Sequence, residues 1–232
     1  MKSLIKTIRN TVPAALLLSC TAGIVHAQQM GQSMASAEKM DKMEMKPMSY
    51  MIPQKPEDIS PLLNGEKIPM AMLPDASGKM IDLNKTVSQK PTVLIVYRGG
   101  WCPYCSKQLS GLQEAAPELE QLGYQLIAVS TDAPAGLSQS ASKEKLTYTL
   151  LSDADLSLSK QLGIAFKAPK AYWEMLPKTT GGKDSDLLLP VPAVYILDRA
   201  GVIRFEYINP DFKQRLNPAL LKAAATSIKA DL

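Results

Sequence analysis

The sequence predicts an α/β domain in which a mixed β-sheet is covered by helices on both faces. Three observations predict this fold class. Continuous apolar runs at 92–97 and 124–130 are typical of buried strands. A helical pattern between them supplies the crossover that parallel strands need. Two late strands, at 194–197 and 202–207, enclose the turn signal "DRAG" and predict an antiparallel hairpin.

The other elements complete this order along residues 56–232, a length that allows one hydrophobic core. We expect a short strand with its turn at 78–85, helices at 106–122, 135–146 and 155–162, a short strand at 148–151, and an amphipathic closing helix at 218–232. Residues 165–189 fit no regular element, so we expect a surface insertion there.

The N-terminal 27 residues have the pattern of a secretory signal peptide. Lys2, Lys6 and Arg9 precede an apolar stretch, and Val25-His26-Ala27 ends in small residues, which predicts cleavage after Ala27. The apolar stretch is about a dozen residues long, whereas a spanning helix needs ~20. We therefore expect an exported protein, periplasmic or secreted. The alternative is a lipoprotein anchored through Cys20, because "LLSC" is similar to a lipobox.

Cleavage after Ala27 changes the composition in ways that restrict function. Three Lys/Arg and no Asp/Glu leave with the signal, so the net charge falls from +4 to +1 and gives no reason to expect nucleic acid or an acidic substrate as a partner. His26, the only histidine, leaves as well. A mature chain without histidine excludes a Ser-His-Asp triad, a Cys-His pair and histidine-ligated metals.

Residues 28–55 form a segment rich in Met, Lys, Ser and Gln, which predicts a flexible linker. Its methionines allow a copper-handling hypothesis, since thioethers bind Cu(I). The simpler interpretation is a low-complexity tether whose methionines are unspecific or absorb oxidants.

Cys102 and Cys105, in "WCPYC", are the only cysteines that remain after cleavage. One pair without histidine cannot complete a zinc site or an iron–sulfur cluster. Haem attachment needs a histidine where Ser106 stands. We therefore expect no metal and no cofactor.

Two interpretations of the pair remain, a structural staple and a redox centre. A disulfide between Cys102 and Cys105 closes a very short loop, so it gains little loop entropy as a staple. The pair instead follows a strand and a Gly-Gly turn and begins a helix, with Pro103 in the first turn. A thiol at a helix N-terminus has a lowered pKa, and Arg98 adds a positive charge. The sequence thus favours dithiol redox chemistry with Cys102 as nucleophile and Cys105 as its partner.

The stretch "VYRGGWCPYC" resembles the AhpC/TSA family of the thioredoxin superfamily, in its peroxiredoxin-like subgroup with a CxxC centre. "LLSDADLSLSKQLGI" and "LPVPAVYILDRAGVIRFEYINPDFKQRLNP" are also similar, so the resemblance covers about residues 56–232. It implies a thioredoxin-like fold and thiol-dependent reduction of peroxides, with a thioredoxin-like protein as reductant.

The chain departs from the family pattern P-x-x-x-[TS]-x-x-C. If Cys105 is aligned with the peroxidatic cysteine, Arg98 and Cys102 replace the Pro and the Thr; if Cys102 is aligned, Ile95 and Gly99 do so. Pro192 falls where the family has an arginine. It resembles the cis-proline that faces the CxxC of thioredoxins and would help to dock a substrate thiol.

Several other residues have both a functional and a structural interpretation. Arg98 stabilises a thiolate or polarises a peroxide, or is a plain surface charge. Trp101 shields the cysteines and contacts partners, or only packs, and Tyr104 sets their exposure or is solvent-facing bulk. For Asp132 we expect a loop or cap role rather than an acid at the active face. Tyr172 and Trp173 either line a substrate wall or pack locally.

These observations predict a thiol-dependent antioxidant oxidoreductase that reduces hydrogen peroxide or organic hydroperoxides. Cys102 would become a sulfenic acid, Cys105 would condense with it, and an external thiol would reduce the disulfide. The alternative enzyme is a thiol–disulfide exchanger acting on proteins, and the third hypothesis is the copper-handling protein. Sequence alone leaves open the oligomeric state and which cysteine meets the peroxide.

Overall fold

The computed structural model describes residues 51–232. The predicted signal peptide, the lipobox cysteine Cys20 and the methionines of residues 28–50 lie outside the described residues. From Met51 a short 3₁₀ turn (η1, Pro56–Asp58) leads into the domain.

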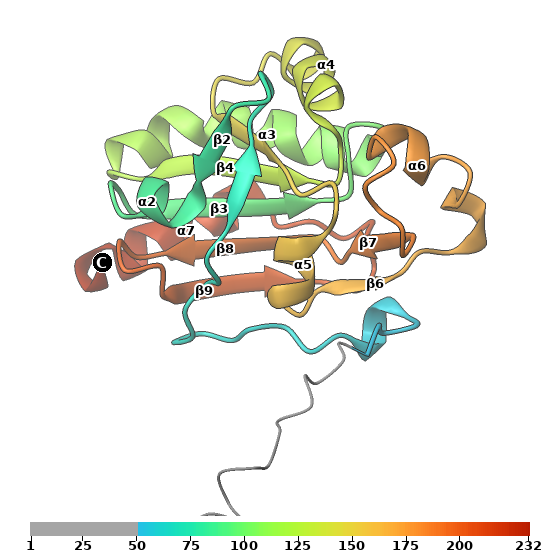
Figure 1. The fold of residues 1–232 in the computed structure, drawn as a ribbon. Helices are drawn as coiled ribbons and strands as arrows, with labels where there is room; N and C mark the ends of the chain where they lie inside the picture. Colours follow the sequence, from blue (N-terminus) through green and yellow to red (C-terminus); the bar gives the residue numbers. More distant parts are fainter. Residues whose placement is uncertain (1–50) are drawn as a thin grey trace, which may run out of the picture. The chain divides into compact units, whose positions relative to one another are not determined.

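A five-stranded mixed sheet forms the centre of the domain, in the order β5-β4-β3-β8-β9. Its strands are β3 (Thr92–Tyr97), β4 (Gln125–Ser130), β5 (Thr149–Ser152), β8 (Ala193–Leu197) and β9 (Ile203–Ile208). β3, β4 and β5 run parallel, while β8 pairs antiparallel with β3 and β9 with β8. Both the parallel units and the late hairpin were predicted, and the structure confirms them (Figure 1).

Helices cover both faces of the sheet, as expected, because alternate side chains of each strand point to opposite sides. Val93, Ile95 and Tyr97 of β3 pack with the helices α3 (Pro103–Gln121) and α7 (Pro218–Ile228). Leu94 and Val96 pack on the other face. The helices there are α2 (Leu83–Val87) and α5 (Ser157–Gln161). The helix α4 (Pro134–Glu144) lies beside α3 and β5, and a 3₁₀ turn (η3, Lys229–Asp231) ends the chain.

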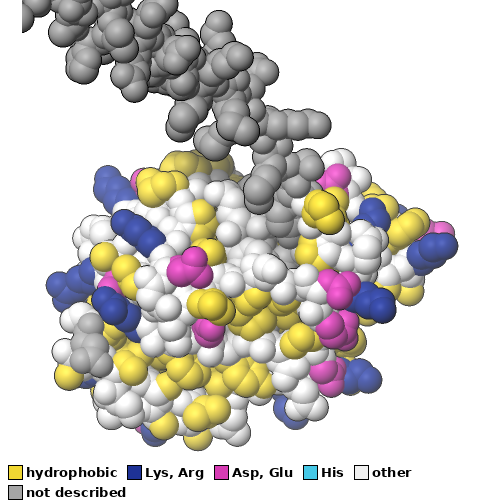
Figure 2. All heavy atoms as spheres, turned by 90° about the horizontal axis from the view of Figure 1, so that it is seen from below, with side chains coloured by type: hydrophobic (Ala, Val, Ile, Leu, Met, Phe, Trp, Pro, Cys, Tyr) yellow, Lys and Arg dark blue, Asp and Glu magenta, His cyan; other side chains and the backbone are white. Residues whose placement is uncertain are grey.

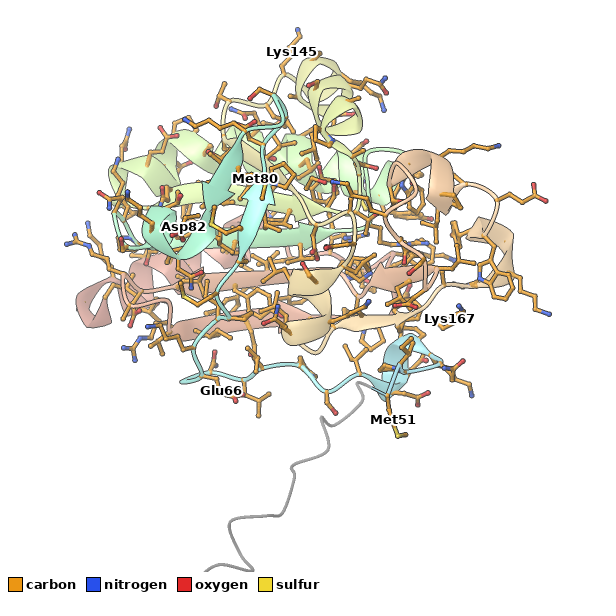
Figure 3. All side chains as sticks on the ribbon, in the orientation of Figure 1. Met51, Glu66, Met80, Asp82, Lys145 and Lys167 are labelled. Carbon is orange, nitrogen blue, oxygen red and sulfur yellow. The ribbon has the colours of Figure 1, made fainter. Side chains whose placement is uncertain are left out.

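A small hairpin precedes the central sheet. It pairs β1 (Met72–Pro74) with β2 (Met80–Asp82), which lies in the predicted region 78–85. Figure 3 labels Met80 and Asp82 on this hairpin. The Asp82 carboxylate accepts a hydrogen bond from the Lys85 backbone N–H at 2.9 Å, so it caps α2, the helix that follows directly.

Residues 165–189 are more regular than the sequence predicted. The segment begins with β6 (Ala165–Lys167) and ends in β7 (Leu188–Pro190), and these two strands pair antiparallel. A 3₁₀ turn (η2, Lys170–Tyr172) and the short helix α6 (Leu176–Thr179) lie between them. Three-residue strands carry too weak a pattern to be recognised, because their pairing is decided by distant chain.

Contacts of Lys167 fasten this insertion internally. Its ammonium donates to the Asp186 carbonyl and lies 5.2 Å from the centre of the Trp173 ring. Figure 3 labels Lys167 at the base of the insertion, and in Figure 1 α6 and β7 lie beyond the carboxyl end of β3. Lys167 thus stabilises the insertion internally, and the insertion lies at the carboxyl end of β3, where the cysteine motif begins.

The surface carries charges of both signs. On the face shown in Figure 2, Lys/Arg and Asp/Glu side chains are interspersed, and hydrophobic side chains gather near the middle. Within residues 51–232, no helix is long and apolar enough to span a membrane.

Candidate active site

The junction between β3 and α3 carries the cysteine motif. Gly99 has a φ of 152°, and a Cβ there would collide with the Trp101 indole nitrogen and crowd the Asp132 carboxylate. At Gly100 a Cβ would collide with the Ser140 hydroxyl. Both glycines are required because the chain turns tightly against its neighbours before the helix begins.

Asp132 fixes this turn from the end of the neighbouring strand β4. Its carboxylate accepts hydrogen bonds from the Gly100 backbone N–H at 2.7 Å and from the Ser130 hydroxyl at 3.3 Å. The side chain is 3% exposed, and burial raises the pKa of Asp132. Asp132 therefore has the expected structural role in a loop, and what it holds is the turn that carries the dithiol.

The two cysteines are free thiols at the start of α3. Cys102 is the N-cap and Cys105 lies one turn later, and their exposures are 1% and 0%. The hydrogen bond from the Cys105 thiol, with help from the Cys105 backbone N–H and the charges of Arg98 and Arg215, lowers the pKa of Cys102 to about 6. Burial and the neighbouring Cys102 raise the pKa of Cys105. The pair is therefore a thiolate on Cys102 beside a protonated Cys105.

Arg98 is buried, with 3% exposure, and does not lie at the surface. Its guanidinium carbon lies 5.1, 4.6 and 4.3 Å from the ring centres of Trp101, Tyr172 and Phe212. Among the described residues its Nε has no hydrogen-bond partner. Three aromatic faces thus hold the positive charge near the Cys102 thiolate by cation–π contact.

Arg215 makes the direct contacts to sulfur, although no local pattern in the sequence singles it out. Its Nη2 donates to Cys105 Sγ at 3.3 Å and lies 4.0 Å from Cys102 Sγ. Nη1 donates to the Gln108 amide oxygen at 3.1 Å, and Nε donates to the Phe212 carbonyl at 2.7 Å. Arg215 belongs to the stretch "DFKQRLNP" that carried part of the family resemblance, which was the available signal.

Residues 209–217, between β9 and α7, form what we call the covering segment. Phe212 packs edge-on against Tyr104, with ring centres 5.6 Å apart, and also contacts Arg98. Leu216 is buried with both cysteines in one cluster. Tyr104 itself is 39% exposed. The segment therefore lies over the dithiol, and the two sulfurs are closed to solvent in this state.

Pro192 does not have the predicted geometry. All peptide bonds in the described residues are trans, so the expected cis bond before Pro192 is wrong. The physical reason is the strand context. Val191 donates its N–H to the Ile164 carbonyl at 2.8 Å, and β8 starts at Ala193, paired with Val96. The chain thus runs extended from β7 into β8, which a trans bond continues. Pro192 is buried next to the carboxyl end of β3.

Of the two neighbouring aromatic residues in the insertion, Tyr172 contacts the site, whereas Trp173 packs within the insertion. Tyr172 lies 5.5 Å from Trp101, ring centre to ring centre, and contacts Arg98. Trp173 donates its indole N–H to the Ala168 carbonyl at 2.7 Å and so packs locally. Residues 51–232 contain no group of three His, Cys, Asp or Glu side chains placed to hold a metal ion.

A low-pKa cysteine at a helix N-terminus, a second thiol one turn later and a thioredoxin-like sheet define a dithiol oxidoreductase. Comparison with protein families then gives the family. Residues 64–206 match the model of the AhpC/TSA family, and the chain belongs to that family. The resemblance to the AhpC/TSA family is confirmed.

Curated relatives of the chain are peroxiredoxins. Peroxiredoxin Bcp of Escherichia coli strain K12 is 32% identical over 155 residues, which are 67% of this chain and 90% of the relative. The chloroplastic peroxiredoxin Q of Suaeda salsa is 28% identical over 194 residues, covering 83% of this chain and 79% of the relative. These relatives support a thiol-dependent peroxidase function.

Solved structures share the fold. Peroxidoxin BcpB of Mycobacterium tuberculosis has a TM-score of 0.58 at 20% identity, covering 72% of this chain and 96% of that one. Reduced Prx3 of Vibrio vulnificus in complex with hydrogen peroxide has a TM-score of 0.60 at 20% identity, covering 71% and 99%. The thioredoxin-like fold is therefore that of peroxiredoxins.

Proposed function

We propose that the chain reduces hydrogen peroxide or organic hydroperoxides through a cycle between the Cys102–Cys105 dithiol and its disulfide. One observation carries this proposal. The Cys102 sulfur, with its pKa lowered to about 6, is flanked by a protonated Cys105 and by two arginines. A thiolate is the form of cysteine that attacks, and fixed positive charge stabilises negative charge that develops on a peroxide oxygen.

The cycle has three balanced steps. The Cys102 thiolate attacks one peroxide oxygen, the O–O bond breaks, and the other oxygen leaves as an alcohol or water after taking one proton. Cys102 is then a sulfenic acid, two electrons more oxidised. The Cys105 thiol condenses with it, which forms the S–S bond and releases water. Two external thiols finally reduce the disulfide and become a disulfide themselves.

Cys102 is the proposed nucleophile even though one alignment with the family places Cys105 at the peroxidatic position. The two thiols share one hydrogen bond in which Cys105 is the donor. Burial and the neighbouring Cys102 raise the pKa of Cys105, so Cys105 keeps its proton at neutral pH. A group that must remain protonated suits the resolving role, because it holds its proton until the sulfenic acid has formed.

Thiol–disulfide exchange with proteins is the second candidate. The low pKa of Cys102 and the CxxC spacing also favour it. Its further support, a cis-proline at 192, is removed by the trans bond. Two arginines beside the sulfurs favour the peroxidase, because a developing oxyanion needs them more than a disulfide does.

Rapid mixing of the reduced protein with hydrogen peroxide tests the proposal. Wild type should form its disulfide in milliseconds. Cys105→Ser should trap a sulfenic acid that a dimedone probe labels, whereas Cys102→Ser should give neither. A trapped sulfenic acid in Cys102→Ser alone would assign the attack to Cys105. Slow reaction with peroxide, combined with fast reduction of insulin disulfides, would instead support exchange.

We further propose that a thioredoxin-like protein is the reductant and that the chain is exported with cleavage after Ala27. Mass spectrometry of the protein from its native host checks the export. A mature N-terminus at Gln28 supports it, whereas a lipid-modified Cys20 would show anchoring.

A further inference from the structure

A buried amide, that of Gln108, lies on the same face of α3 as Cys105. The two residues are three positions apart in the helix, so their side chains are neighbours on its surface. Gln108 is 8% exposed, and no step of the proposed dithiol cycle uses it. Burying a polar side chain costs free energy unless its atoms find hydrogen-bond partners. The hydrogen bond that Gln108 makes therefore indicates what this side chain contributes.

The partner of Gln108 is Arg215, the residue that contacts both sulfurs. The amide oxygen accepts a hydrogen bond from Arg215 Nη1 at 3.1 Å. The neighbouring nitrogen of the same guanidinium, Nη2, donates to Cys105 Sγ at 3.3 Å and lies 4.0 Å from Cys102 Sγ. A guanidinium is planar and rigid, so fixing one of its nitrogens restricts where the others point. The hydrogen bond to Gln108 thereby sets the direction of the Nη2 donor.

The remaining contact of the Arg215 guanidinium lies within the covering segment. Its Nε donates to the Phe212 carbonyl at 2.7 Å, three residues earlier in the chain. Among the hydrogen bonds of Arg215 within residues 51–232, only the one to Gln108 joins it to α3 without involving sulfur. This bond does not depend on the redox state of the cysteines. It therefore holds Arg215 against α3 also when the thiolate has been consumed.

The acceptors that hold Arg215 carry no charge. One is an amide oxygen and the other a backbone carbonyl, and in the described part of the chain no carboxylate forms a salt bridge with it. Arg204 shows the alternative, because its Nε and Nη2 both donate to the Asp198 carboxylate, at 2.9 and 2.7 Å. The charge of Arg215 thus remains available to the Cys102 thiolate, which it stabilises. A carboxylate in place of the amide would accept the same hydrogen bond but neutralise that charge.

We propose that Gln108 is a positioning residue of the dithiol cycle, because its neutral amide oxygen aims Arg215 at the sulfurs without neutralising the guanidinium. This inference rests on the proposed peroxide reduction and adds a residue to its first step. In that step Arg215 stabilises the Cys102 thiolate before the attack and the negative charge that develops on the leaving peroxide oxygen. Gln108 takes no part in making or breaking bonds and acts only through Arg215.

Gln108→Glu tests the neutrality of the amide. The thiolate of Cys102, followed by its absorbance against pH, should form at higher pH than in wild type, since the new carboxylate compensates the charge of Arg215. In stopped-flow experiments with hydrogen peroxide, the variant should react about fivefold more slowly at pH 6 and at nearly the wild-type rate at pH 9. An unchanged titration of Cys102 would overturn the electrostatic part of the proposal.

Gln108→Met tests the aiming. Methionine has a similar length but is only a weak acceptor, so Arg215 keeps its charge and loses its direction. The rate constant with hydrogen peroxide should fall about tenfold at pH 9, where Cys102 is a thiolate in both proteins, because a misplaced donor stabilises the developing charge less well. A variant as fast as wild type at this pH would overturn the geometric part of the proposal.

A double-mutant cycle shows whether Gln108 acts through Arg215. Adding Gln108→Met to Arg215→Met should slow the reaction by less than about twofold, because no guanidinium remains to be aimed. Independent effects would multiply instead. A further tenfold loss in the double variant therefore contradicts a positioning role and indicates a general structural one.

Gln113 offers matched controls on the same helix. Its amide exchanges hydrogen bonds with Thr147 and makes none with Arg215. Gln113→Glu and Gln113→Met should leave the rates and the titration of Cys102 unchanged, and effects equal to those at Gln108 would contradict the proposal. Circular dichroism verifies the folding of every variant. If wild type fails to react with peroxide, the peroxidase proposal fails alone, because the thiolate titration of Gln108→Glu needs no peroxide.

Discussion

Two arginines approach the dithiol from different parts of the chain and are held in different ways. Arg98 precedes Cys102 by four residues and lies among three aromatic rings. Arg215, 110 residues after Cys105, is held by hydrogen bonds to Gln108 and Phe212 and contacts sulfur directly. Cation–π contact fixes a charge while leaving N–H donors free, whereas the hydrogen bonds aim the guanidinium. Both arginines thus lower the pKa of Cys102 through their charge, but only Arg215 also directs hydrogen-bond donors at sulfur.

We expect the largest loss of peroxide reactivity from Arg215→Met. It removes the donor at both sulfurs and an anchor of the covering segment, so the rate constant with hydrogen peroxide should fall about 100-fold, as for other oriented donors at developing negative charge. Stopped-flow tryptophan fluorescence measures it. Arg215→Lys keeps the charge without the fork and should recover only part of the loss. A Met variant as fast as wild type would show that contact with sulfur is not needed.

Arg98→Met should slow the peroxide reaction by lowering the fraction of Cys102 that is thiolate, so the size of the effect should depend on pH. Loss of this charge raises the pKa of Cys102, because Arg98 helps to lower it. We expect about a tenfold slower reaction at pH 6 and nearly wild-type rates at pH 9, where both proteins are deprotonated. Absorbance of the thiolate at 240 nm, followed against pH, gives the shift. An equal loss at every pH would mean that Arg98 aims the peroxide instead.

The pH dependence of the wild-type peroxide reaction tests whether the pKa of Cys102 controls the rate. With the pKa of Cys102 at about 6, the peroxide rate should be flat above pH 7 and fall about tenfold between pH 8 and pH 5. Folding lowers this pKa from 9.0, so the thiolate stabilises the reduced fold at high pH, and that stability is lost as pH falls through 6. The buried Asp153, whose pKa is raised to about 6, acts with the opposite sign in both wild type and Cys102→Ser. From pH 5 to pH 8 the urea midpoint of wild type should therefore increase relative to that of Cys102→Ser, and an equal pH dependence of the two midpoints contradicts the assignment.

Phe212→Leu should have the smallest effect and tests the covering segment. The ring contacts both Tyr104 and Arg98, so its loss loosens the segment over the sulfurs. Alkylation of Cys102 by a bulky maleimide should accelerate about threefold, while that by small iodoacetamide changes little. Tyr172→Leu removes a ring from Arg98 on the other side and is the matched control. Equal acceleration in both variants would place the barrier at Arg98 rather than at the segment.

The fold was predictable in most respects from local pattern. The buried runs at β3 and β4 and the turn signals at β8 and β9 gave the right elements, because each pattern spans enough residues to be distinct. Two expectations were wrong, namely an irregular segment at 165–189 and a cis bond before Pro192. The structure instead has β6 paired with β7 and a trans bond before Pro192, and both depend on contacts with residues far away in the sequence.

The candidate site divides in the same way. Cys102, Cys105, Arg98, Trp101 and Tyr104 follow one another in a single motif, so their neighbourhood was expected. The contacts of Tyr104 and Trp101 with Phe212 and Tyr172 were not, since those rings arrive from other loops. The anchoring of the cysteine turn by Asp132 likewise needs β4 to lie beside β3.

By itself, the sequence determined that a strand leads through two glycines into a helix capped by Cys102, and that Cys102 and Cys105 are the only cysteines of residues 51–232. Both follow from local backbone preference and from composition. Only the tertiary structure decided which charges and covers surround the Cys102 thiol. Arg215 and Phe212 reach it because α7 packs against α3, which brings the covering segment over the helix N-terminus. The electrostatic field at a sulfur is a sum over distances, and distances between remote residues exist only once the chain has packed.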